Sequence, residues 1–85
     1  MTFTELEEFM VARGIRRDAL AINEIPGDGQ YCIQFDGETT NVFRFERGAR
    51  MNLTSFRDLS AAMTYFRSLV FADQSAFAHW DGRIR

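Results

Sequence analysis

Few side chains in this sequence are of a type that performs catalysis or binds metal. Among the 85 residues there is one histidine, His79, and one cysteine, Cys32. A zinc site takes three or four protein ligands, and a lone histidine without a cysteine or carboxylate cluster does not supply them. No base lies close to Cys32 in the sequence that would activate its thiol as a nucleophile. We therefore expect no catalytic residue, no metal site and no cofactor.

The carboxylates occur where local structure accounts for them. Three glutamates lie within residues 5–8, at the start of a predicted helix, where the helix dipole favours negative charge. Asp36 and Glu38 flank an Asp-Gly turn, in which an aspartate side chain accepts hydrogen bonds from the local backbone. The glycine-containing run at 27–29 lacks the further glycine and the helix start of a dinucleotide-binding loop. Enzymatic acid pairs also need a sheltered cleft, so we expect the protein not to be an enzyme.

The first of the elements that position these residues is a helix over 4–13. Thr4 is placed as its N-cap, and Glu7, three residues later, would complete a capping box. Gly14 is placed to end the helix, because glycine readily adopts the left-handed conformation that follows a helix.

A second helix is predicted in the last third of the chain, capped by Ser55 or Asp58. Its apolar residues recur at alternating intervals of three and four, which is typical of a helix packed on a core; they are Leu59, Ala62, Met63, Phe66, Leu69 and Val70. Beyond this helix the pattern loosens. We expect about residues 72–85 to be a loosely ordered tail or a short helix.

Between the helices, apolar residues alternate with polar ones at the period of a half-buried strand. This alternation predicts strands over 30–36 and 41–47, joined by a hairpin at the Asp-Gly pair, with a further strand over 49–54 and a short one over 19–22. We therefore predict that residues 1–85 form a single α+β domain. It would have an N-terminal helix, an antiparallel β-meander of three to four strands and a C-terminal helix packed on the sheet.

The net charge and the cysteine content limit the cellular compartments and the classes of partner that we expect. The net charge of −2 argues against a general field for phosphate and suits a basic protein partner. A single cysteine allows no internal disulfide, which fits a reducing compartment. The acidic start is unlike a secretory signal, and no apolar run approaches the ~18 residues of a membrane span. We expect a cytoplasmic protein that does not bind membranes.

An interpretation as a single-stranded nucleic-acid binder rests on Phe43-Arg44-Phe45, together with Tyr31 and Phe35. Aromatic side chains interleaved with arginine stack on the bases of single strands. However, these phenylalanines alternate with polar residues and are expected on a core face, and the net acidity opposes phosphate. Binding to another protein is therefore the principal expectation, with nucleic acid disfavoured.

Several short motifs between residues 31 and 66 bear on the kind of partner. They are Tyr31-Cys32, Glu46-Arg47-Gly48, Phe56, and Ala62 with Tyr65-Phe66. In these motifs the chain resembles the small α+β immunity proteins of bacterial polymorphic-toxin systems. The resemblance implies a cytosolic, non-enzymatic protein that neutralises a cognate toxin by binding it, and it implies no catalytic residues.

Residues expected at the partner interface were chosen for exposure and charge; they are Asp36, Glu38, Arg44, Glu46 and Trp80. Tryptophan and arginine are enriched at interface hot spots, and arginines follow Trp80 in the sequence. The main alternative is a small acidic chaperone or adaptor for a secreted effector, which would be a dimer. A homodimer also stays open, because a bare edge at the first or last strand of the meander can pair with a second copy or with the partner.

Overall fold

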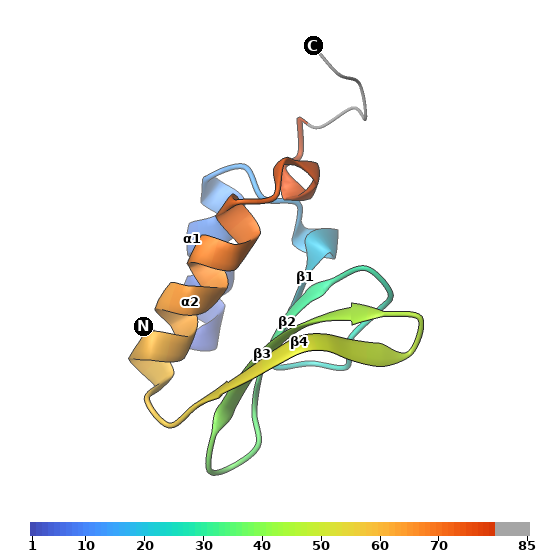
Figure 1. Ribbon diagram of the computed structural model, residues 1–85. Coiled ribbons are helices and arrows are strands. Elements are labelled where there is room, and N and C mark those ends of the chain that lie inside the picture. Colours follow the sequence, from blue (N-terminus) through green and yellow to red (C-terminus); the bar gives the residue numbers. More distant parts are fainter. Residues whose placement is uncertain (80–85) are drawn as a thin grey trace.

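The computed structural model describes residues 1–79, in which two helices lie on one face of a four-stranded sheet (Figure 1). The elements in chain order are α1 (Phe3–Ala12), the 3₁₀ helix η1 (Arg17–Ala19), β1 (Leu20–Ile22), β2 (Tyr31–Phe35), β3 (Thr40–Glu46), β4 (Ala49–Phe56), α2 (Leu59–Phe71) and the 3₁₀ helix η2 (Gln74–Ala76). The α+β architecture with a helix near each end is confirmed. None of the helices described is long and apolar enough to traverse a lipid bilayer.

Helix α1 begins two residues earlier than predicted. Thr2, not Thr4, is the N-cap: its side chain accepts from the backbone N–H of Glu5, and the Glu5 side chain accepts from the Thr2 backbone N–H at 2.8 Å. The same Thr-x-x-Glu pattern occurs at both positions, so the pattern alone does not choose between them. Starting at Thr2 places Phe3 on the helix, where it packs against the core beside Leu6.

The end of α1 follows the prediction. Gly14 has a φ of +96°, in the left-handed region that favours glycine. The backbone N–H of Gly14 donates to Val11 and that of Ile15 donates to Met10, which is the hydrogen-bond pattern of a Schellman cap. Ile15 is buried just beyond this cap.

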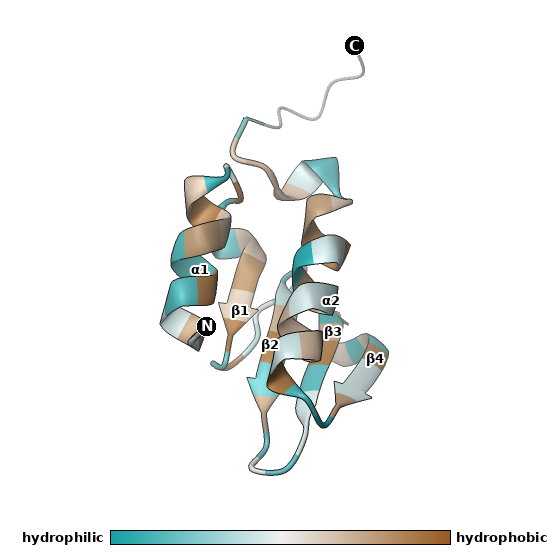
Figure 2. Ribbon diagram, turned by 90° about the vertical axis from the view of Figure 1, so that its left-hand side faces the viewer, coloured by the Kyte–Doolittle hydropathy of each residue, from teal (hydrophilic) through white to brown (hydrophobic). Residues whose placement is uncertain are grey.

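Helix α2 is capped by Asp58, whose side chain accepts from the backbone N–H of Ser60; the alternative cap, Ser55, lies within β4. The predicted apolar stripe faces the sheet, and its fully covered members are Ala62, Met63, Phe66 and Val70. In Figure 2 the two helices lie side by side in front of the strands. Together they cover one face of the sheet and form the main core.

The sheet is mixed, so the prediction of an antiparallel meander is wrong in part. Its strand order is β1-β2-β3-β4, and the β2–β3 and β3–β4 pairs are antiparallel, but β1 pairs with β2 in parallel. A parallel pair needs a crossover in place of a tight hairpin. Residues 23–30 form this crossover. The connection is tied to the end of β3, where Gly29 N–H donates to Phe45 and Asp28 accepts from the Arg47 N–H.

The crossover creates a second, smaller core on the face of the sheet that the helices do not cover. Ala21, Cys32 and Phe43 are completely buried there, with Phe45 packed against them. The sequence predicted one core face bearing the phenylalanines. The strand register instead places Phe43 opposite Cys32 on this second face. Both faces of the central strands are therefore covered, which the alternating pattern did not indicate.

Strand β4 forms one edge of the sheet and contains a bulge. Its register with β3 shifts between Val42 and Arg44, so Asn52 and Leu53 together face the single residue Phe43. Asn52 takes the left-handed conformation at φ +56°, which asparagine tolerates better than most residues. A bulge of this kind bends the strand and increases its twist.

Candidate protein-binding surface

The four predicted interface residues within 1–79 do not form one surface. Asp36 and Glu38 lie at the β2–β3 turn, where β3 begins, whereas Arg44 and Glu46 lie at its other end. A strand rises about 3.3 Å per residue, which separates the two pairs by roughly 20 Å. Trp80, the fifth predicted residue, falls outside the part of the chain that the structure describes.

Asp36 organises the β2–β3 turn. Its carboxylate accepts from the backbone N–H groups of Glu38 and Thr39, from the Thr39 hydroxyl and from the Asn41 side chain. The backbone hydrogen bonds, led by that of Thr39, lower the pKa of Asp36 to about 2. Because this carboxylate forms its hydrogen bonds within its own turn, its main role is to stabilise that turn. Contact with a partner would be a secondary role.

Arg44 lies on the helix-covered side of the sheet, not on the exposed face where it was expected. The register pairs it with Tyr31, whose hydroxyl accepts from Arg44 at 3.3 Å and donates to Asp73 at 2.6 Å. Arg44 Nη1 is also 3.5 Å from the Asp73 carboxylate. Its Nε is 3.0 Å from Glu46 Oε1, but the N–H is not directed at that oxygen, so the contact is an ion pair without a hydrogen bond.

This cluster of Tyr31, Arg44, Glu46 and Asp73 ties the end of α2 to the sheet. Asp73 also accepts from the backbone N–H and hydroxyl of Ser75 and so caps η2. Burial, followed by the hydrogen bond to Asp73, raises the pKa of Tyr31 to about 12. The same hydrogen bond is the main cause that lowers the pKa of Asp73. The segment after α2, where a tail or short helix was predicted, thus contains a 3₁₀ helix anchored to β2 and β3.

Cys32 has the environment of a structural cysteine. Its side chain is completely buried in the second core, and its Sγ lies 3.5 Å from the Gln30 carbonyl. Burial raises the pKa of the Cys32 thiol to about 11, so the thiol is protonated and a poor nucleophile at neutral pH. Across residues 1–79 no group of three histidine, cysteine or carboxylate side chains is arranged to hold a metal ion.

The aromatic side chains considered for nucleic-acid stacking are mostly covered. Phe43 is completely buried and Tyr31 is 7% exposed, so neither ring presents a face on which a base could stack. Phe45 is half-buried against the second core. Only Phe35, at 52% exposed, offers a large part of its ring to solvent.

Exposed apolar side chains gather instead on the sheet. Four large ones lie on the strands or on the β1–β2 connection; they are Ile25, Phe35, Met51 and Leu53. Ile25 is 92% exposed at the connection, and Leu53 is 49% exposed on β4. Ile25 and Phe35 line one hollow, whereas Met51 and Leu53 lie on β4. Large apolar side chains that stay in water can mark an interaction surface.

The outer side of β4, which we call the β4 edge, lies at the end of the strand order opposite β1. All of its residues are at least partly exposed, and its order in the sheet leaves one side without a partner strand. No backbone hydrogen bond from another element of residues 1–79 reaches it. An edge of this kind can accept a further strand from another chain.

A hollow of about 430 Å³ lies between the β1–β2 connection and the strands, and we call it the sheet hollow. It is lined by Asn23, Glu24, Ile25, Pro26, Gln34, Phe35, Asp36, Asn41 and Arg50. Arg50 belongs to β4, and its guanidinium lies 5.1 Å from the ring centroid of Phe43. The β4 edge and the sheet hollow are therefore adjoining parts of one surface.

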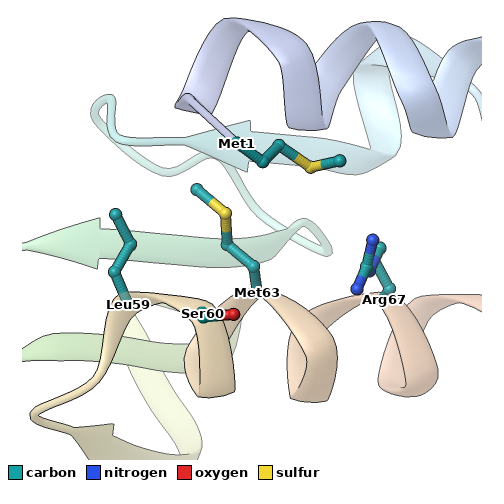
Figure 3. A pocket seen from close by; sticks show the side chains of 5 residues that line it. All are labelled: Met1, Leu59, Ser60, Met63 and Arg67. Carbon is teal, nitrogen blue, oxygen red and sulfur yellow. The ribbon is translucent and has the colours of Figure 1, made fainter.

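A second hollow, of about 280 Å³, lies between the start of α2 and the residues that precede α1. Figure 3 shows Met63 and Arg67 pointing from α2 toward Met1. Arg67 also donates to Thr64 and lies over the Phe9 ring. These engaged, flexible side chains make this hollow a weaker candidate than the surface around β4.

Sequence reasoning did not identify the β4 edge as the principal surface. A strand was predicted over 49–54, but its position at the edge depends on which strands pair, and the sequence does not reveal that. The alternation of Met51, Asn52 and Leu53 predicts that both apolar side chains share one face, but the bulge places them on opposite faces of β4. Comparisons of the chain with protein families, curated proteins and solved structures find no match.

Proposed function

We propose that this protein is a non-enzymatic protein-binding module whose partner docks on the β4 edge and the sheet hollow. One observation carries the proposal: an eight-residue edge strand without a partner on its outer side, with Met51 and Leu53 exposed on it. Main-chain groups on such an edge provide affinity, and the neighbouring side chains provide specificity. Apolar anchors next to a polar rim are a common composition of interfaces.

Within this class we propose an immunity protein that acts in the cytoplasm and neutralises a cognate toxin by blocking it. The motif resemblance between residues 31 and 66 motivates this identity. A rigid inhibitor suits the fold, because Phe3 packs the start of α1 against the core and the cluster around Tyr31 and Asp73 ties the end of α2 to the sheet. A buried, unpaired Cys32 is consistent with a reducing compartment.

The test is growth rescue with surface variants. The open reading frame next to this gene is expressed in a bacterial host with the wild-type protein, with Leu53→Asp, or with Leu59→Asp. Leu59 is a matched control because it is also an exposed leucine, at 38%, but lies on α2. We expect rescue and co-elution with the wild type and Leu59→Asp, and loss of both with Leu53→Asp.

Other outcomes identify the alternatives. Toxicity that the wild-type protein does not relieve contradicts the immunity function and favours the chaperone or adaptor. Equal rescue by both leucine variants contradicts the assignment of the surface to β4. Circular dichroism of each variant verifies that a loss of rescue does not come from unfolding.

A further inference from the structure

We propose that the β4 edge recognises an extended, acidic segment of its partner, which adds to the sheet as a fifth strand beside β4. This inference deepens the proposed function and rests on it, since it names the chemistry of the partner at the same surface. It is argued from the charges around β4, the position of the bulge and the side chains on either side of it.

Three arginines lie within or next to β4. Arg47 precedes the strand, Arg50 lies within it and Arg57 follows it. None of these three forms an ion pair with another residue of 1–79. The other described arginines are engaged: Arg16, Arg17 and Arg44 are in ion pairs, and Arg13 and Arg67 lie over Phe9.

The sheet hollow that Arg50 lines also contains Glu24 and Asp36, and Asp36 is engaged by its own turn. The other carboxylates close to these arginines have other roles. Glu46 is paired with Arg44, and Asp58 accepts from the Ser60 N–H at the start of α2. Asp28 accepts from the backbone N–H of Arg47, not from its guanidinium. Arg47 and Arg57 are thus available to a partner, whereas Arg50 lies over the Phe43 ring. Complementary charge would steer an acidic strand to this edge and disfavour a basic one.

The bulge decides which part of β4 can pair. Asn52 and Leu53 interrupt the regular register, so residues 49–51 and 54–56 form two regular runs of three residues each. Leu53 and Ser55 lie on the face of the second core, since Ser55 contacts Asn41 at 2.7 Å and Asn41 lines the sheet hollow. Arg50 lies on this same face, since it pairs with Phe45 and lies over Phe43, whereas Met51 pairs with Arg44 and lies on the opposite face. An added strand therefore places one row of its side chains beside Arg50 and the alternate row beside Met51. The occupant that fits is an extended segment with apolar and acidic residues in alternation.

The probe is an eight-residue, end-blocked peptide of alternating valine and glutamate, matched in length to β4. Its control has lysine in place of glutamate. Titration of the ¹⁵N-labelled protein is expected to shift the amides of residues 49–57 with the acidic peptide. The lysine peptide should bind at least about tenfold more weakly, which corresponds to about 1.4 kcal/mol.

Charge-reversal variants locate the effect. The triple variant Arg47→Glu, Arg50→Glu, Arg57→Glu should reverse the preference between the two peptides. The double variant Arg47→Glu, Arg57→Glu leaves Arg50 on Phe43, so it should weaken binding without disturbing the second core. As a control of equal net charge, the triple variant Arg13→Glu, Arg16→Glu, Arg17→Glu should retain the preference of the wild type.

Equal binding of the two peptides, no binding of the acidic one, or shifts outside β4 would each overturn the inference. Concentration-dependent shifts of β4 without peptide would also overturn it, because they would identify a second copy of this chain as the occupant. If the toxin binds the charge-reversed variants as well as the wild type while Leu53→Asp abolishes rescue, the proposed function stands and this inference falls. If the peptides behave as expected but no toxin is neutralised, the proposed immunity function is contradicted, and the charge preference of the β4 edge is retained.

Discussion

Replacing Tyr31 with phenylalanine removes a single hydroxyl from the contact that joins the sheet to the end of α2. This hydroxyl donates to Asp73 at 2.6 Å and accepts from Arg44 at 3.3 Å, and the Tyr31 side chain is nearly buried. A hydrogen bond to a charged group contributes about 1.5–3 kcal/mol. Asp73 keeps its two bonds from Ser75 and its contact with Arg44 in the variant. We therefore expect a loss at the lower end of that range, about 1.5 kcal/mol.

The assay is thermal and urea unfolding followed by circular dichroism at pH 7. For a domain of this size, a loss of about 1.5 kcal/mol lowers Tm by about 6–12 °C. Tyr65→Phe is the matched control, because Tyr65 is an exposed tyrosine of α2 whose hydroxyl forms no hydrogen bond within residues 1–79. Its Tm should stay close to that of the wild type.

The pH dependence of the same pair gives a second readout. The pKa of Tyr31 is raised to about 12 in the folded state, so its contribution is complete below the unfolded pKa of about 10 and is lost as the pH rises through 12. The pKa of Asp73 is lowered, so its contribution is present above its unfolded pKa of about 3.9 and is lost as the pH falls through the folded value. In Tyr31→Phe, the free energy of unfolding should therefore change less with pH than in the wild type, both at alkaline pH and at acid pH. Equal losses in the Tyr31 and Tyr65 variants, or an unchanged pH dependence, would refute the reasoning.

Three further predictions concern the turn, the second core and the thiol. Asp36→Asn should lower Tm at pH 7 but not near pH 2, because the lowered pKa of Asp36 provides stability above about 3.9 that is lost as the pH falls to about 2; Glu38→Gln, measured alongside, should have little effect, and equal effects of the two would contradict the turn role. Phe43→Ala should lower the free energy of unfolding in urea by about 3–5 kcal/mol, whereas Phe35→Ala, at an exposed position, should change it by less than about 1 kcal/mol. A loss in Phe43→Ala as small as that in Phe35→Ala would mean that the second core is not packed as described. Cys32 should react with a thiol reagent much more slowly in the native protein than in denaturant, and rapid native labelling would contradict its burial and raised pKa.

The helices were the most predictable part of the fold, because local chemistry determines where they begin and end. The apolar stripe of α2 and the glycine after α1 identify faces and boundaries without knowledge of the rest of the chain. The start of α1 was misplaced by two residues, since Thr2 and Thr4 have equivalent partners. Packing of Phe3 against the core decides between them, and that is a tertiary contact.

The arrangement of the sheet was less predictable, because it depends on contacts between distant residues. The residues of β1 were expected in the sheet, but the sequence does not state that they run parallel to β2. That direction requires residues 23–30 to cross the sheet, and the crossing buries Phe43 on a second face. Arg44 was consequently expected in solvent and is found beside Tyr31.

The candidate surface was also only partly predictable, because it too depends on contacts between distant residues. Asp36 was selected as an exposed acid of a turn, and the turn does place it at the sheet hollow, but its hydrogen-bonding capacity is used within the turn. A bare edge at the first or last strand was expected to be able to pair with a partner, but the sequence did not single out β4, because an edge is a property of strand order. Exposure of Met51 and Leu53 follows from that order and not from their residue types.

The central claim is that this protein acts by binding a partner protein along β4. Hydrogen–deuterium exchange of the protein alone and in complex with the product of the neighbouring open reading frame tests this directly. We predict slower exchange at the amides of residues 49–56 on complex formation, with the amides of α2 little changed. A complex that leaves the β4 amides unchanged and protects the outer faces of the helices would contradict the claim.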